Sequence, residues 1–164
     1  MDSGINFAEL LQYTEEENQR WKKWFERHPE ALAVSAGIAG EDDVVGLLVH
    51  IFAVELRYAE RLFGLPESSY EKLRSANLEQ VFAIADEARK KFKQFLATAT
   101  EEQMNQVINF ETRSAGKLAA SKRKILAHAL LHGVRHWAQI ATTLRRAGYK
   151  QDWQHDFLFS EAMK

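Results

Sequence analysis

The stretch KRKILAHALLHGVRHWAQIATTLRRAG, residues 122–148, decides the fold of this chain. Its apolar residues recur at intervals of three and four, which is the period of an amphipathic helix. Ser121 before it is a good N-cap, and Gly148 closes it at the C′ position. The sequence therefore predicts a helix of about seven turns, whose apolar face other long helices must cover.

Three further segments have the same helical period. They run from about Asn6 to Arg27, from Asp42 or Asp43 to about Gly64, and from the N-cap Asn77 to about Leu96. Two prolines and eight glycines leave these stretches uninterrupted, and alternating β-branched runs are few. We predict an all-α domain, a four-helix bundle that occupies residues 1–164 as a single unit.

The connections are less regular. Residues 31–40 are small and glycine-bearing and predict a crossing loop, while Thr100 to Gln103 has the pattern of a one-turn capping box. Residues 107–120 lack a helical stripe and predict an irregular or extended link that leaves room for a short strand pair. The long links after the first and third helices permit crossover connections. The tail, with Trp153 and Phe157, is apolar enough that we expect it to pack back on the bundle.

The composition argues against several classes of function. The formal net charge is −1, so no overall field favours nucleic acid or an anionic membrane. No apolar run approaches the roughly 20 residues of a membrane span, and the N-terminus lacks a signal peptide pattern, so we expect a cytoplasmic protein. The chain has no cysteine, which excludes disulfides, thiolate metal sites and a cysteine nucleophile.

Histidines carry the only distinctive chemistry. His128, His132 and His136 follow one another at steps of four, which stacks them on one helix face. His50 lies on another predicted helix between apolar neighbours, so it too is expected to be buried. Neutral imidazoles that face one interior need partners, and one metal ion satisfies several of them together. Three imidazoles without thiolate or carboxylate favour Zn²⁺ or Ni²⁺.

The same residues permit a plainer interpretation. An isolated HxxxH pair is more often a pair of core histidines than a metal site, and spacing does not settle which three of the four histidines would bind. His28, at a helix end, and His155, in the tail, are expected at the surface. There is no HExxH, no Glu-x-x-His and no glycine-rich phosphate loop, so a zincin, a di-iron site and a nucleotide cradle are improbable.

The run from residue 132 to the glycine resembles the last helix of the DinB/YfiT-like metal-dependent superfamily. The matching positions are His132, His136, Gln139-Ile140, Leu144-Arg145 and Gly148, followed by Asp156-Phe157-Leu158 in the tail. On the second helix they are Leu48, His50, Glu55 and Leu62-Phe63-Gly64. Where members often carry arginine and glycine after the last histidine, this chain has Trp137-Ala138, which changes the wall of the pocket.

The resemblance implies a four-helix bundle in up-down-down-up order, usually a homodimer. It also implies a divalent metal, zinc or nickel, on His50, His132 and His136, with His128 one turn away as a neighbour of the ligands. Members include transferases and isomerases that use a low-molecular-weight thiol. Arg135 is the candidate for steering an anionic thiol, and Trp137 is a second candidate for substrate binding; a solvated position is the alternative for Arg135.

Glu55 and Gln139 are candidates for contacts behind the ligands. Glu55 could orient His50 or act as a base, although five residues apart is not one helix face, so a surface carboxylate is the alternative. We predict a metal-dependent transferase that acts with a small thiol on a small-molecule substrate. A metal-dependent hydrolase is the close alternative, and a non-catalytic, metal-stabilised dimeric bundle that acts as a binding or stress protein is the third.

Overall fold

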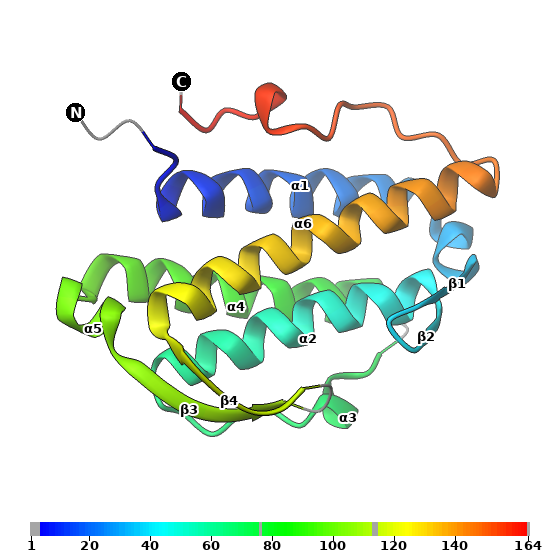
Figure 1. Ribbon diagram of the computed structural model, residues 1–164. Coiled ribbons are helices and arrows are strands. Elements are labelled where there is room, and N and C mark those ends of the chain that lie inside the picture. The colour runs from blue at the N-terminus through cyan, green and yellow to red at the C-terminus, as the bar shows by residue number, and fades with distance from the viewer. Residues whose placement is uncertain (1–3, 76, 113–114, 164) are drawn as a thin grey trace.

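Four long helices form the body of the molecule in the computed structural model, which describes residues 4–75, 77–112 and 115–163 (Figure 1). They are α1 (Phe7–Arg27), α2 (Val44–Leu62), α4 (Leu78–Thr98) and α6 (Lys122–Arg146). All four lie within a few residues of the predicted bounds, and the predicted four-helix bundle is confirmed. None of the described helices is both long and apolar enough to cross a membrane.

Side-chain caps fix where these helices begin. The Asn6 side chain accepts a hydrogen bond from the backbone N–H of Glu9, whose own side chain accepts one from the N–H of Asn6. The side chains of Asp43, Asn77 and Ser121 each accept from the backbone three residues on. Each cap satisfies a backbone donor that the first helical turn leaves free, which is why the local sequence sets the boundaries so closely.

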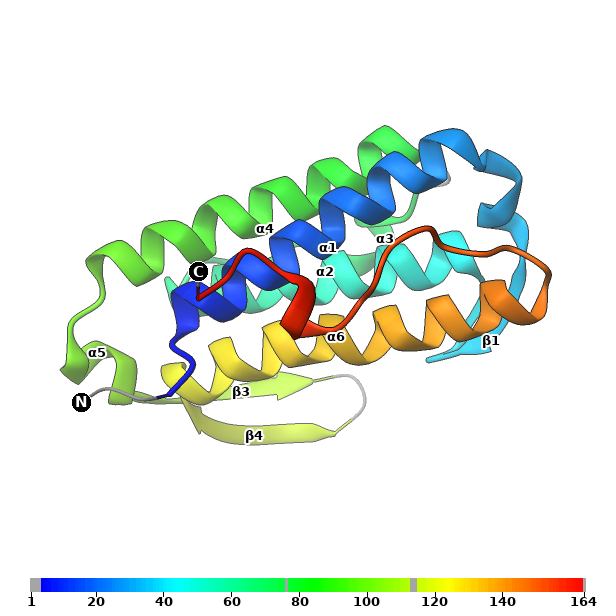
Figure 2. The same ribbon diagram turned by 90° about the horizontal axis from the view of Figure 1, so that it is seen from above.

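The helices run up, down, down and up, as the resemblance implied. In both views α2 and α4 run in the same direction, whereas α1 and α6 run opposite to them (Figures 1 and 2). Two consecutive parallel helices need a link that returns along the bundle. That link follows the second long helix, and it contains the four-residue helix α3 (Tyr70–Leu73). The crossover therefore lies elsewhere than after the first and third helices, where the sequence left room for it.

Both of those other links are short hairpins. After α1 and the 3-10 helix η1 (Pro29–Ala33), strands β1 (Ser35–Ile38) and β2 (Glu41–Asp43) pair antiparallel, so the expected crossing loop is wrong. Ala39 and Gly40 make the tight turn between them with φ of 58° and 81°. Both central residues of such a turn need a positive φ, and alanine is uncommon at the first of them. The sequence therefore carries no recognisable signal for this turn.

The second hairpin replaces the predicted irregular link. After α5 (Glu101–Asn105), whose Thr100 and Gln103 form the expected capping box, β3 (Val107–Thr112) pairs antiparallel with β4 (Gly116–Ser121). Ile108 and Phe110 face the bundle, and the Phe110 ring packs over the Arg61 guanidinium at 4.3 Å. The strand pair for which the sequence left room is thus present, and it is regular along its described length.

The tail packs back on the bundle as expected. It lies along α1 and includes the short 3-10 helix η2 (Phe157–Phe159) (Figure 1). The Tyr13 hydroxyl donates to the carbonyl oxygen of His155 at 2.6 Å, and the Trp153 indole N–H donates to Glu17 at 3.1 Å. These bonds fasten the tail to α1 on the side of the bundle away from the hairpin of β3 and β4.

Candidate metal centre

Three histidines meet where α2 and α6 pack against each other. His50 comes from α2, and His132 and His136 come from successive turns of α6. The imidazole Nε2 atoms of His50 and His132 are 3.3 Å apart, and those of His132 and His136 are 3.1 Å apart. One ligand atom from each of the three residues lies within 4.8 Å of the others. The predicted cluster of His50, His132 and His136 is therefore present in the structure.

The spacing of these nitrogens fits a metal ion. Imidazole nitrogens bind Zn²⁺ at about 2.0–2.1 Å, so two of them on one tetrahedral ion lie about 3.4 Å apart, and at a right angle about 3.0 Å apart. The two short separations in the structure, 3.1 and 3.3 Å, lie between these values. The donor set also fits, because neutral imidazole is a ligand of zinc and nickel.

The three rings are poor bases where they stand. Burial lowers the pKa of His132 to about 3, with further lowering by the charges that His136, His50, His128 and Arg135 would carry. Burial, followed by the proximity of His50, lowers the pKa of His136 to about 4. The pKa of His50 is also lowered, chiefly by burial. All three imidazoles are therefore neutral near pH 7 and keep a lone pair available for a metal.

Gln139 orients one of the rings. Its side-chain Oε1 lies 2.6 Å from Nδ1 of His136, so this nitrogen carries the proton and donates to the amide oxygen. The neutral ring then has its lone pair on Nε2, which lies 3.1 Å from Nε2 of His132. A bond on the far nitrogen is the usual support of a metal-binding histidine, so Gln139 is in a position to support His136 in that way.

His128 lies one turn from the cluster and outside it. Its ring centroid is 5.7 Å from that of His132 and 5.4 Å from the edge-on ring of Tyr58. Burial lowers its pKa as well. The structure therefore places His128 as a neighbour of the three-histidine cluster.

Glu55 occupies the centre of the bundle. Its side chain is fully buried, so the alternative of a surface carboxylate is wrong. Its Oε1 accepts from Arg89 at 2.7 Å, and Arg89 also donates to the Thr14 hydroxyl. Burial raises the pKa of Glu55, and the charge and hydrogen bond of Arg89 oppose the rise. Gly133 makes room for this carboxylate, because a Cβ at that position would lie 2.8 Å from Oε1.

The two predicted substrate-binding residues differ in position. Arg135 is exposed, and its charge contributes to the lowered pKa of His132 and His136. Trp137 is buried in the core, where it stacks on Trp21 with ring centroids 5.1 Å apart. One residue along a helix turns the side chain by about 100°, which takes residue 137 from the histidine face into the core.

His28 and His155 lie outside the three-histidine cluster, and both are half-buried where the sequence suggested surface positions. The His28 ring stacks on Trp24 at 4.3 Å. Nδ1 of His155 lies 2.9 Å from the buried carboxylate of Glu17, and its ring stacks on Trp21. The tail carries His155 back to α1, a contact across 138 residues that local sequence does not encode.

Sequence reasoning missed Glu41 and Tyr70. The Tyr70 ring lies edge-on to the His50 ring at 6.4 Å, and its hydroxyl donates to Glu41 at 2.7 Å. The two residues are 29 positions apart and on different elements, so no local pattern joins them. The acidic run Glu41-Asp42-Asp43 was the available signal, and it predicted only the start of α2.

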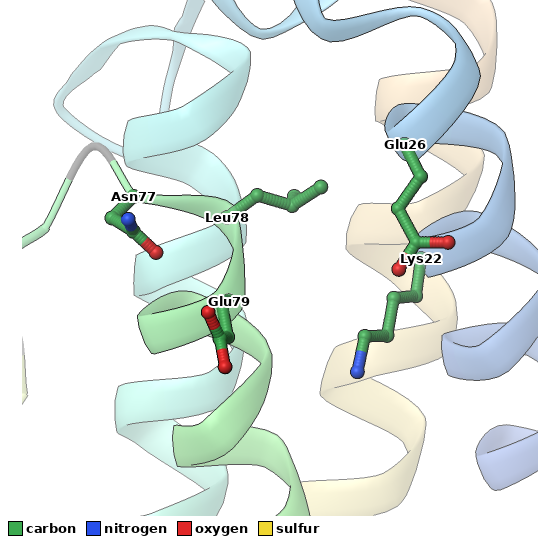
Figure 3. Close-up of a pocket in the computed structure, with 5 residues that line it drawn as sticks. All are labelled: Lys22, Glu26, Asn77, Leu78 and Glu79. Atoms are coloured by element: carbon green, nitrogen blue, oxygen red, sulfur yellow. The ribbon is translucent and has the colours of Figure 1, made fainter.

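Two hollows lie away from the histidines. One, of about 410 Å³, lies between α1 and the first turn of α4, where Lys22 and Glu26 face Asn77, Leu78 and Glu79 (Figure 3). Another, of about 440 Å³, lies between the end of α2 and the hairpin of β3 and β4. Among the described residues, neither hollow is lined by a member of the three-histidine cluster.

The chain is a four-helix bundle in up-down-down-up order with three convergent histidines, and comparison with known sequences identifies its family. The family model of the DinB family matches residues 1–163, and the chain belongs to this family. The fold is similar to that of YfiT from Bacillus subtilis, with a TM-score of 0.67 and 17% identity over 92% of this chain and 94% of that one. YfiT is described as "a probable metal-dependent hydrolase with an unusual four-helix bundle topology". No curated protein matches the chain significantly.

Proposed function

We propose that this protein is a divalent-metal-dependent enzyme whose metal is held by Nε2 of His50, His132 and His136. One observation carries the proposal: one ring nitrogen from each of these three histidines lies within 4.8 Å of the other two, on rings that stay neutral at physiological pH. Membership of the DinB family and the description of YfiT support it. Zinc and nickel are the proposed metals, because the donors are three neutral nitrogens.

Three protein ligands leave coordination positions free, as catalytic sites do and closed structural zinc sites do not. When bound, such an ion supplies Lewis acidity, which lowers the pKa of a coordinated thiol or water. Gln139 keeps the proton of His136 on Nδ1 and so keeps Nε2 aimed at the ion. The exposed cation of Arg135 beside His132 and His136 attracts an anionic substrate.

We propose a transferase that uses a low-molecular-weight thiol as the first candidate reaction. The chain has no cysteine, so a sulfur nucleophile would have to come from a cosubstrate. A hydrolase with water as the nucleophile is the second candidate, which the description of YfiT favours. The two differ in the molecule that attacks, and the three-histidine site serves both.

Metal analysis tests this proposal. Protein made without a histidine tag is assayed for bound metal by mass spectrometry, together with alanine variants of His50, His132 and His136. Near-stoichiometric zinc or nickel in the wild type, lost in each variant, is the expected result. His128→Ala is the matched control: it removes an imidazole one turn away, and metal content should stay near that of the wild type.

Thermal unfolding separates a catalytic site from a structural one. A catalytic ion sits in a bundle that folds without it, so His132→Ala should abolish metal binding with little loss of stability. If instead the ion is structural, the same change or chelation lowers the melting temperature by many degrees. A wild-type protein that takes up neither zinc nor nickel refutes the proposal.

A further inference from the structure

We infer that Tyr70, held in place by Glu41, is a specificity-determining residue of the histidine site: its ring limits the size of the molecule that reaches the ligands beside His50. The inference rests on the proposed metal-dependent function. It assigns a role to the crossover between α2 and α4, a segment outside both helices that carry the histidines.

The first step places Glu41 next to the site. Its carboxylate is buried against the first turn of α2, where a Cβ on Gly46 would lie 2.9 Å from Oε2. Residues 46 and 50 are four apart on this helix and so share a face, one turn from each other. The Glu41 carboxylate therefore lies about one turn from His50, and its charge raises the pKa of that histidine against the lowering by burial.

The second step ties the crossover to Glu41. The Tyr70 hydroxyl donates to Oε1 at 2.7 Å, and the Arg74 guanidinium lies 3.4 Å from Oε2. One buried carboxylate thus holds both ends of α3, which spans only four residues and has too few backbone bonds to be stable alone. Charge-assisted hydrogen bonds to a buried acceptor are stronger than bonds at the surface, so this tether fixes α3 in place.

The third step is the position of the ring. The half-buried Tyr70 ring stands at 65° to the His50 ring, with centroids 6.4 Å apart. His50 and His132 are themselves only partly buried, so the cluster is reached from outside the bundle core. A rigid aromatic edge beside a partly exposed ligand is a steric wall. It favours a slender nucleophile over one that is branched next to its reacting atom.

The test compares two thiols on cobalt-loaded protein. 2-Mercaptoethanol is the slender probe and 2-methyl-2-propanethiol the branched one, and binding is followed by the thiolate-to-cobalt absorption. The wild type should bind the slender thiol more tightly. Tyr70→Ala should shift the ratio of the two affinities by about tenfold toward the branched thiol, which is the usual scale for a few methyl groups in a pocket. Cobalt affinity itself should not change.

Three variants sharpen the result. Tyr70→Phe keeps the ring but loses the tether, and Glu41→Ala frees the ring, so both should shift the ratio in the same direction by less than Tyr70→Ala. Glu41→Gln keeps an acceptor for the hydroxyl and should stay closer to the wild type. Glu67→Gln is the matched control, because it loosens the other anchor of the crossover, on Arg57 and Arg61, and should leave the ratio unchanged.

The experiment distinguishes failure of the proposed function from failure of the inference about Tyr70. If the wild type binds no cobalt, zinc or nickel, the proposed function fails and this inference fails with it. If metal binds but Tyr70→Ala leaves the ratio of affinities as in the wild type, only the inference about Tyr70 is refuted. An equal shift in Glu67→Gln also refutes it, because loosening the crossover anywhere would then suffice.

Discussion

Acidification of the metal-free protein tests the state of the three histidines. The pKa values of His132 and His136 are lowered to about 3 and about 4, whereas an unfolded histidine titrates near 6.5. Above pH 6.5 both rings are neutral in the folded and the unfolded chain, and they add no pH dependence. Below it the unfolded chain binds protons that the folded chain does not, so the free energy of unfolding must fall as the pH drops from 6.5 toward 3.

The size of the effect follows from the interval between the pKa of an unfolded histidine and the lowered pKa values in the folded chain. One pH unit below the unfolded pKa, each ring that stays neutral in the fold lowers stability by about 1.4 kcal/mol. His136 is 4% exposed and keeps most of this value, while the partial exposure of His132 reduces its share. We therefore expect the two rings to remove about 2–3 kcal/mol between pH 7.5 and 5.5, out of a total stability of roughly 5–15 kcal/mol.

Urea unfolding in the presence of a chelator measures this change. The transition is followed by tryptophan fluorescence at pH 7.5 and 5.5, for the wild type and for the double variant His132→Gln, His136→Gln. The titratable groups outside the histidine cluster are common to both proteins, so their contributions cancel in the difference. The wild type should lose about 2–3 kcal/mol more than the double variant. Equal losses would show that these rings are protonated in the fold, and the reasoning about neutral ligands would be refuted.

Three further changes have defined outcomes. Arg89→Met leaves the buried Glu55 carboxylate without its partner and should lower the free energy of unfolding by about 3–5 kcal/mol in urea denaturation; replacing both residues by methionine should recover most of the loss. Gly133→Ala drives a Cβ against Glu55 and should lower stability by about 1–3 kcal/mol, whereas a rise in melting temperature would contradict the close approach of α2 and α6. His155→Ala breaks the bond to Glu17 and should make the tail sensitive to limited proteolysis while the helices keep their circular dichroism; a cleavage pattern like that of the wild type would count against the tail contact.

Much of this architecture was predictable because it is local. Asn77 and Ser121 cap helices through bonds to residues three positions on, and such signals lie within one turn of sequence. His132 and His136 are four residues apart, so their spacing predicts that they share one face of a helix. The apolar neighbours of His50 made it a candidate for the same site. The resemblance to a known family then selected His50, His132 and His136 from the four histidines and implied the order of the helices, which periodicity leaves open.

The residue patterns alone missed the hairpin of β1 and β2 and the place of the crossover, and the reason is different. The turn depends on Ala39 at a positive φ, which is an uncommon conformation for a residue with a Cβ and leaves no pattern to find. The direction of α4 relative to α2 depends on which apolar faces pack best in three dimensions, and both parallel and antiparallel arrangements suit the same helical stripe.

By itself, the sequence determined the helices, their caps and the two-histidine face of α6, because each depends on residues within a turn or two of one another. The tertiary structure alone decided the geometry that brings Nε2 of His50 to 3.3 Å from that of His132, the burial of Glu55 with Arg89, and the place of Tyr70 beside the site on Glu41. These contacts join residues 29 to 82 positions apart. Their geometry comes from the packing of whole helices, which no local pattern of side chains specifies.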